Sequence, residues 1–301
     1  MPEYPSKFDP RTLNLSTPVE SQYLETCWAF AGAAALEHHF YQQHDIELDV
    51  SERFIVNKAG VPPKSGGSIS DINNSLLKIS GIVDETIYPN YPWVTSTPPN
   101  DTETIDTHQL HTCETIRNLT IDKIKKYITN YGGLWFGWGW SRRYTSANHA
   151  YYSPDRVAEQ SVGSYVSAHA MCIVGWDDDF ALSNFDCAYR ANPTTPGALL
   201  IKNSWGAGYE DNGYYWISYE NIPDIKAGTY WKYITPAYTT RTSVFDTNPS
   251  QLFYNKTMYD TAKSTIRGTL YTSPCNQDIY TITLSYIVLP PLGDYSASDT
   301  L

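Results

Sequence analysis

The chain has little charge and no long run of hydrophobic residues. Only 18% of its 301 residues are charged, the net charge is -11, and lysines and arginines nowhere cluster. This acidic balance argues against a surface for nucleic acid or for an anionic membrane. Because no apolar stretch approaches the roughly 18 residues of a membrane-spanning helix, we expect no membrane span. The 41% share of hydrophobic residues predicts a folded, globular chain.

Cysteine is also scarce. An odd number of five cysteines leaves at least one thiol and permits at most two disulfides. The first residues, MPEYPSKFDPR, lack the apolar centre of a signal peptide, so we expect a form that is either cytosolic or already trimmed. Five Asn-x-Ser/Thr sequons lean instead towards a secreted protein or a lytic compartment.

The apolar pattern predicts two structurally different parts. Residues 12–112 are expected to form a helical lobe and residues 113–225 a β-rich lobe, with the polar segment 100–113 crossing between them. Both lobes belong to the predicted domain 1–225. Residues 226–301 are a β-prone extension that packs on the β lobe or forms a partial accessory domain.

Local signals place the helices and strands of these lobes. Three helices are expected to begin at the N-caps Thr26, Ser51 and Thr120, and Gly132-Gly133 ends the last of them. A further helix covers residues 69–82. The expected strands are LWFGWGW (134–140), AMCIVGW (170–176), ALLIKNSW (198–205) and GYYWISY (213–219).

Cys27 stands at the start of the most apolar expected helix, in SQYLETCWAFAGAAALEHHF. With Thr26 as N-cap, Cys27 lies in the first turn, where backbone N–H groups and the helix dipole favour negative charge. Such surroundings lower the pKa of a thiol, and the thiolate is the nucleophile. The same N–H groups can stabilise an oxyanion. A small apolar cysteine that packs at a helix end is the alternative.

A reactive thiolate needs an imidazole partner, and we favour His169 among the seven histidines. It lies between two alanines at the head of an apolar strand, whereas the alternative, His149, leads into an irregular segment. Asn203 can accept the ring N–H of the imidazole, and Trp205 can shield this bond from water. Gln22 can donate its amide to an oxyanion, or it is an ordinary polar loop residue.

Four segments follow one another along the chain in an order that is found in a known protein family: PVESQYLETCWAFAGAAALE, SGGS, AHAMCIVGWDDD and KNSWGAGYEDNGYYWISY. Over residues 3–220 the chain resembles the papain-like (C1 family) cysteine peptidases, especially microbial members that begin near PSxYDLR and carry GWDD after the histidine. Cys27 and His169 are 142 positions apart, within the separation of about 130–150 typical of papain-type enzymes. Asn203 lies 176 positions after Cys27 because of an insertion at 177–200.

The resemblance implies a papain-like α+β fold, with the active-site cleft between a helical N-terminal lobe and a β-rich C-terminal lobe. It implies a cysteine endopeptidase, without cofactor or metal, that cleaves polypeptides through a thioester acyl-enzyme. We expect a monomer. Cys27 would be the nucleophile, His169 the base and acid, Asn203 the orienting residue and Gln22 the oxyanion donor. The expected substrate-binding residues are Gly66, Gly67, Ala170 and Trp205.

The segment between Gln22 and Cys27 departs from this family. The family usually has Gly and Cys there, whereas this chain has YLET and is one residue shorter. The neighbouring disulfide is therefore absent, and Glu25 puts a negative charge two residues from the nucleophile. We expect a compact loop held by packing, and a mature-like start without an inhibitory pro-region. These departures leave two alternative functions open: a catalytically silent papain-fold binding protein, and an exopeptidase or acyl-transferase on the same fold.

Three weaker patterns have structural alternatives. The run HQLHTC has metal-like spacing, but a solvated connector is favoured. The run WDDDF can hold calcium, but a turn at a strand end is favoured. The candidate disulfides are Cys172–Cys187 and Cys113–Cys275, with a buried thiol at Cys172 as the alternative.

Overall fold

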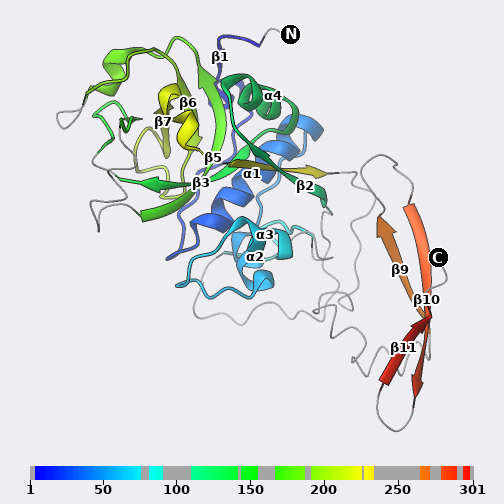
Figure 1. Cartoon of the computed structure of the whole chain (residues 1–301). Coiled ribbons are helices and arrows are strands. Elements are labelled where there is room, and N and C mark those ends of the chain that lie inside the picture. The colour runs from blue at the N-terminus through cyan, green and yellow to red at the C-terminus, as the bar shows by residue number, and fades with distance from the viewer. Residues whose placement is uncertain are drawn as a thin grey trace.

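The computed structural model places three helices before most of the strands (Figure 1). The predicted order, a helical part followed by a β-rich part, is confirmed. The residues that the structure describes are 4–75, 81–90, 110–141, 144–154, 167–186, 191–225, 227–233, 265–271, 279–289 and 294–298. The helices are α1 (Cys27–His44), α2 (Glu52–Ala59), α3 (Ile69–Ser75) and α4 (Ile121–Tyr131), with the short 3-10 helices η1 (Pro10–Leu13), η4 (Leu182–Phe185) and η5 (Tyr219–Asp224).

Helix α1 is buried along most of its length. Residues 28–40 are all buried, because a helix that is apolar on every side packs inside the protein. Small residues allow its neighbours to approach closely, and a Cβ on Gly32 would lie 2.9 Å from Cδ1 of Ile72 in α3. Helix α2 begins at the predicted cap, Ser51, whose hydroxyl accepts the Phe54 N–H at 3.1 Å.

One sheet joins the strands of the β-rich part. Its order is β2-β8-β3-β5-β6-β7-β4, and β1 pairs with β5 outside this path. Strand β5 pairs antiparallel with both β3 and β6, so it lies inside the sheet. The bounds are β1 (Lys7–Phe8), β2 (Leu110–Arg117), β3 (Leu134–Trp140), β4 (Ala150–Tyr151), β5 (Ser167–Asp177), β6 (Ala198–Lys202), β7 (Tyr214–Ser218) and β8 (Ala227–Tyr233).

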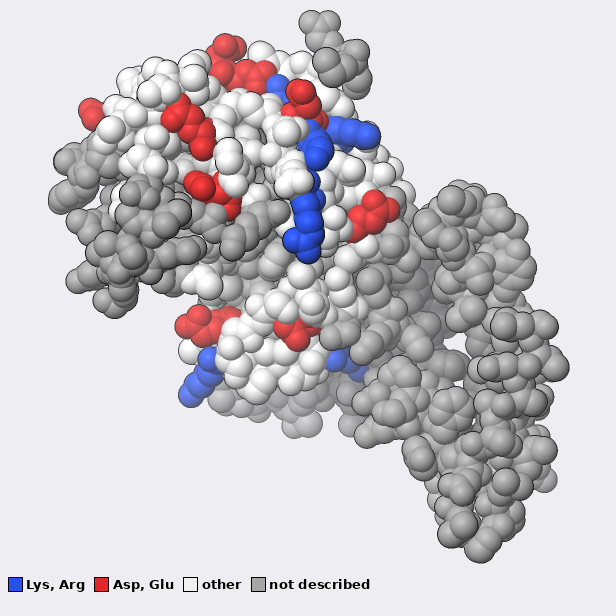
Figure 2. Space-filling model, in the orientation of Figure 1, with Lys and Arg blue, Asp and Glu red and all other residues white. Residues whose placement is uncertain are grey.

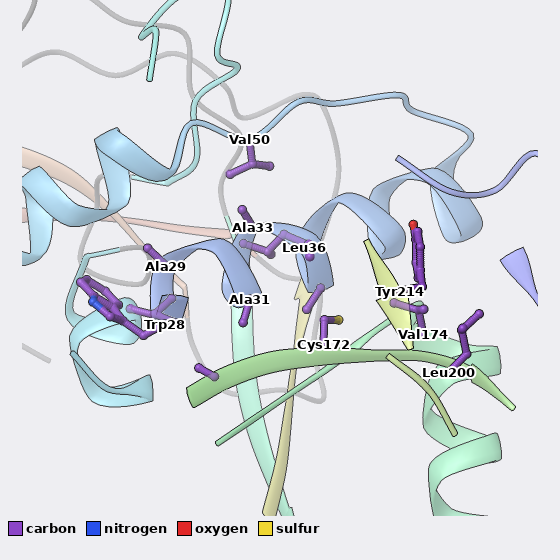
Figure 3. Close-up of a cluster of buried hydrophobic side chains, with 14 of the residues drawn as sticks. Trp28, Ala29, Ala31, Ala33, Leu36, Val50, Cys172, Val174, Leu200 and Tyr214 are labelled. Carbon is purple, nitrogen blue, oxygen red and sulfur yellow. The ribbon is translucent and has the colours of Figure 1, made fainter. Parts of the chain in front are cut away.

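Helices cover both faces of β5. Cys172 and Val174 belong to the buried cluster under α1 (Figure 3). Met171 and Ile173, which alternate with them along the strand, belong to a second cluster with Ile124 of α4. The strand that carries His169 is therefore held between two helices, one of which begins with Cys27.

Two boundaries differ from the sequence prediction. Strand β8 pairs with β2 and β3, so the main sheet continues beyond the predicted domain end at 225. The last residues of the predicted polar crossing, from Leu110, belong to β2, because they find partners 118 or more positions away in β8. The strands β9 (Thr265–Tyr271), β10 (Ile279–Leu289) and β11 (Asp294–Ser298) form a second sheet, ordered β11-β10-β9 and separate from the first in Figure 1.

Charge is spread over the surface. On the face shown in Figure 2, acidic side chains form small separate groups, and basic side chains form a narrow row in the upper part and stand singly in the lower part, with uncharged residues between them. Within the described part of the chain, no helix is both long and apolar enough to cross a membrane.

A buried polar network ties α1 to the sheet. Glu37 of α1 and Lys202 of β6 form an ion pair of 3.3 Å, and both side chains are almost fully buried. The hydroxyl of Thr17 donates to Glu37 at 2.6 Å, and the Val50 N–H donates to the other carboxylate oxygen at 3.2 Å. Glu52 is also buried nearby, and Asn90 donates to it at 2.5 Å. Burial, and then the charge of Glu37, raise the pKa of Glu52 well above its usual value.

We expect Glu52→Gln to stabilise the protein at neutral pH. Because the folded-state pKa is raised, the favourable contribution of Glu52 is present below its unfolded pKa and is lost as pH rises through the folded value. The variant should melt about 2–4 °C higher than the parent at pH 8, the shift that ~1 kcal/mol produces in a chain of this size. At pH 4 the difference should vanish. Glu47→Gln, which removes an exposed carboxylate, is the matched control; an equal gain there would contradict the explanation.

Candidate active site

Cys27 is the first residue of α1. Thr26 occupies the predicted N-cap position, but its hydroxyl donates to the Tyr23 carbonyl at 2.5 Å and caps no helical N–H. The expected capping bond was therefore wrong, since the hydroxyl holds the preceding loop instead. No side chain caps the N–H groups in the first turn of α1. The Cys27 sulfur lies in hydrogen-bond reach of the backbone of Ala170, the residue after His169.

His169 is joined to Asn203 by a hydrogen bond of 2.9 Å between Nε2 and Oδ1. The Ser204 N–H also donates to this Oδ1, at 2.8 Å. Because a backbone N–H can only donate, the atom it meets must be the amide oxygen, and Nε2 of His169 must then carry a proton. Nδ1 of the neutral ring is left as the basic nitrogen. The indole of Trp205 stacks on the imidazole, with centroids 4.9 Å apart and an interplanar angle of 22°.

Burial favours the neutral forms of both the Cys27 thiol and the His169 imidazole. It raises the pKa of the Cys27 thiol, and the charge of Glu25 adds to this, while the backbone of Ala170 and Trp28 opposes it. Burial lowers the pKa of His169, against the effects of Asn203 and Glu25. The backbone N–H groups at the helix start oppose this rise, but desolvation outweighs them, so the expected lowering of the Cys27 pKa was wrong.

The loop from Gln22 to Cys27 is compact, as expected, and contains no cysteine bridge. Leu24 has a φ of 54°, a left-handed conformation that shortens the path of the chain. The Gln22 amide donates through Nε2 to the Leu24 carbonyl at 2.7 Å. Ser204 donates its hydroxyl to Oε1 of Gln22 at 2.8 Å and accepts the Gln22 N–H through its carbonyl at 2.7 Å. Ser204, which sequence reasoning missed, thus holds both Gln22 and Asn203.

The glycine pair of SGGS lies beside Trp28, the residue after Cys27. A Cβ on Gly67 would lie 2.4 Å from the Trp28 ring, so this position requires glycine. Gly66 has a φ of 67°, which also favours glycine. The Glu25 N–H donates to the Pro63 carbonyl at 3.0 Å, which fastens this segment to the loop before Cys27.

The alternative histidine lies in a different environment. Nδ1 of His149 is 3.4 Å from a carboxylate oxygen of Glu210, and the His149 backbone has a φ of 57°. The structure therefore brings together Cys27, His169 and Asn203, and it joins His149 to an acidic residue of another loop.

The acidic run WDDDF forms a turn at a strand end. Asp178 accepts hydrogen bonds from Lys125 at 2.6 Å and from Tyr219 at 2.7 Å. Asp177 forms an ion pair with Lys7 at 2.9 Å. These contacts engage Asp177 and Asp178 with the protein's own groups, and the turn at 178–179 follows β5, as the favoured alternative predicted. No group of metal-binding side chains occurs among the residues described.

The three cysteines among the described residues, Cys27, Cys113 and Cys172, are thiols. Cys172 is a buried thiol whose pKa burial raises to about 12, so its pairing with Cys187 was wrong and the alternative holds. The Cys113 thiol hydrogen-bonds Asn73. Cys187 and Cys275 lie outside the described residues, as does His108 of the HQLHTC run.

The chain belongs to the papain family of cysteine proteases, because residues 4–232 match that family. It is 25% identical to Peptidase 1 of Psoroptes ovis over 225 residues, 74% of this chain and 63% of that protein. It is 34% identical to the viral cathepsin of Mamestra configurata nucleopolyhedrovirus over 87 residues, 28% of this chain and 26% of the relative. The chain thus spans less than two thirds of these relatives.

Solved structures share the fold. The cysteine protease and lectin-like domains of Cwp84, a surface layer associated protein of Clostridium difficile, superpose with a TM-score of 0.66 and 26% identity, over 77% of this chain and 52% of that one. A Carica candamarcensis cysteine protease in complex with E-64 superposes with a TM-score of 0.57 at 19% identity, over 77% of this chain and the whole of that one. The predicted papain-like α+β fold is therefore confirmed.

Proposed function

We propose that the protein is a cysteine endopeptidase in which Cys27 is the nucleophile and His169 the general base and acid. One observation carries this proposal. The imidazole of His169 is fixed by Asn203 at 2.9 Å and stacked under Trp205, and the next residue, Ala170, contacts the Cys27 sulfur through its backbone. A nucleophile, a base and an orienting amide are thus adjacent, which is the arrangement that nucleophilic catalysis requires.

The reaction begins with a proton transfer. Nδ1 of His169 takes the proton of the Cys27 thiol, and the thiolate attacks the carbonyl carbon of the substrate. The resulting oxyanion is stabilised by the first N–H groups of α1 and by the Gln22 amide. His169 then protonates the leaving amine as the C–N bond breaks and the thioester remains. Water, deprotonated by His169, attacks the thioester and releases the acid and the thiol.

The substrate is an extended polypeptide. The backbone at Gly66 and Gly67 is placed to pair with it as an added strand, and Ala170 and Trp205 flank the reacting bond. We propose that the protein acts as a monomer, outside the cell or in a lytic compartment. The surface-layer association of the Clostridium difficile protein supports such a location.

We expect Cys27 to be the thiol that iodoacetamide labels first. Cys27 is partly exposed, whereas Cys172 is fully buried with a strongly raised pKa. Brief treatment near pH 6 followed by peptide mass mapping should label Cys27 faster than Cys113 or Cys172, because in the proposed reaction the imidazole of His169 accepts the Cys27 proton and the thiolate is the form that is alkylated. His169→Ala should slow this labelling. Even labelling of the three thiols would contradict the proposal.

An internally quenched peptide library tests the proposal as a whole. An endopeptidase cleaves internal bonds, an exopeptidase only terminal residues, and an acyl-transferase needs an added amine acceptor. A silent binding protein cleaves nothing; the engagement of the Gln22 amide by Leu24 is the observation that favours it.

A further inference from the structure

Glu25 is an exposed carboxylate at the mouth of the candidate active site. It lies two residues before Cys27 and is exposed to solvent. Within the described residues, no side-chain hydrogen bond or ion pair engages its carboxylate. Nothing in the proposed reaction uses this charge. It is therefore available to a substrate.

The backbone places Glu25 on one particular side of Cys27. The loop is anchored at two points: Gln22 donates to the Ser204 carbonyl at 2.7 Å, and Glu25 donates to the Pro63 carbonyl at 3.0 Å. The first anchor adjoins Asn203. The second adjoins the segment that carries Gly66 and Gly67, where the proposed function pairs the extended substrate. Because His169 protonates the leaving amine in the proposed reaction, the leaving group lies towards His169 and Asn203, and the acyl part lies towards this glycine segment. Glu25 thus lies on the acyl side of the nucleophile.

The charge of Glu25 reaches both reactive groups. It raises the pKa of the Cys27 thiol and opposes the fall in the pKa of His169. A carboxylate that acts on both groups is also close to any substrate side chain held between them and the glycine segment, because Coulomb interactions fall with distance.

We propose that Glu25 makes the site select a cationic side chain, Arg or Lys, at the substrate residue whose carbonyl carbon Cys27 attacks. This inference rests on the proposed peptidase function and names its substrate class. An exposed carboxylate repels an acidic residue and attracts a basic one, in a manner that added salt weakens. The acidic surface of the whole protein, with a net charge of -11, adds attraction for basic segments of a polypeptide.

The test uses internally quenched peptides that differ only at the acyl residue: Arg, its uncharged isostere citrulline, or Glu. For the parent protein kcat/KM should be about 5-fold higher with Arg than with citrulline, the upper end for one exposed charge pair. Glu25→Gln should bring this ratio close to one. Glu25→Lys should make the Glu peptide the better substrate. The preference of the parent for Arg should shrink as salt is raised to about 0.5 M.

Glu47→Gln is the matched control. It removes an exposed carboxylate beyond the far end of α1, about 27 Å along an 18-residue helix, and should keep the Arg preference. Because the ratio is taken within each variant, a change in folded fraction cancels. A parent that cleaves Arg and citrulline peptides equally, or a Glu25→Gln variant that keeps the preference, would overturn the inference and leave the peptidase proposal standing. A folded parent that cleaves none of the peptides would overturn both.

Discussion

Cys27→Ala and His169→Ala should each abolish peptide hydrolysis, whereas Asn203→Ala should leave a measurable rate. The first two remove an atom that makes a bond or moves a proton, and losses on the order of 10⁶ in kcat accompany such deletions. Asn203 only accepts the Nε2 proton of His169 and selects its tautomer. Its loss should cost about 10- to 100-fold, the value of one hydrogen bond to a charged group.

Asn203→Asp is the informative partner of Asn203→Ala. A carboxylate oxygen can accept the same two donors, His169 Nε2–H and the Ser204 N–H, so part of the rate should return. The variant should also raise the pKa of His169, because a negative charge favours the imidazolium. The pH dependence of kcat/KM and the melting temperature of each variant separate these effects from loss of folding. If His149→Ala were as damaging as His169→Ala in a folded protein, the choice of base would be wrong.

Gln22→Ala should lower kcat by about 10²–10³ and leave KM almost unchanged, because an oxyanion donor acts mainly in the transition state. Ser204 holds the Gln22 carboxamide through Oε1 beside Asn203. One amide hydrogen is used by the Leu24 carbonyl, and an amide has two, so a second remains for the oxyanion. Single-turnover kinetics on one peptide should place the loss in the acylation step.

Ser204→Ala tests how Gln22 is held. Without the hydroxyl the Gln22 carboxamide loses one of its two hydrogen bonds, and kcat should fall by less than in Gln22→Ala, by about 10-fold, the cost of one moderately strong hydrogen bond. An active enzyme that is indifferent to Gln22→Ala would exclude it as a donor. A parent that is slow from the outset, with the same indifference, would support the silent binding protein.

Local sequence was sufficient for the elements that carry the candidate site. The apolar run after Cys27 predicted α1, and the apolar segments around His169 and before Asn203 predicted β5 and β6. These features depend on periodicity within a few residues, which a single sequence displays.

The tertiary structure decided what each of these residues touches. Thr26 looked like a cap, yet its hydroxyl turns to Tyr23 because the shortened loop brings that carbonyl within reach. The role of Ser204 can be recognised only in the folded protein, where Gln22 and Asn203, 181 positions apart in sequence, both hydrogen-bond to it. Desolvation, which reverses the expected direction of the Cys27 pKa, comes from residues distant in sequence. A sequence states the order of side chains, whereas burial and hydrogen bonding between distant segments arise only when those segments pack together.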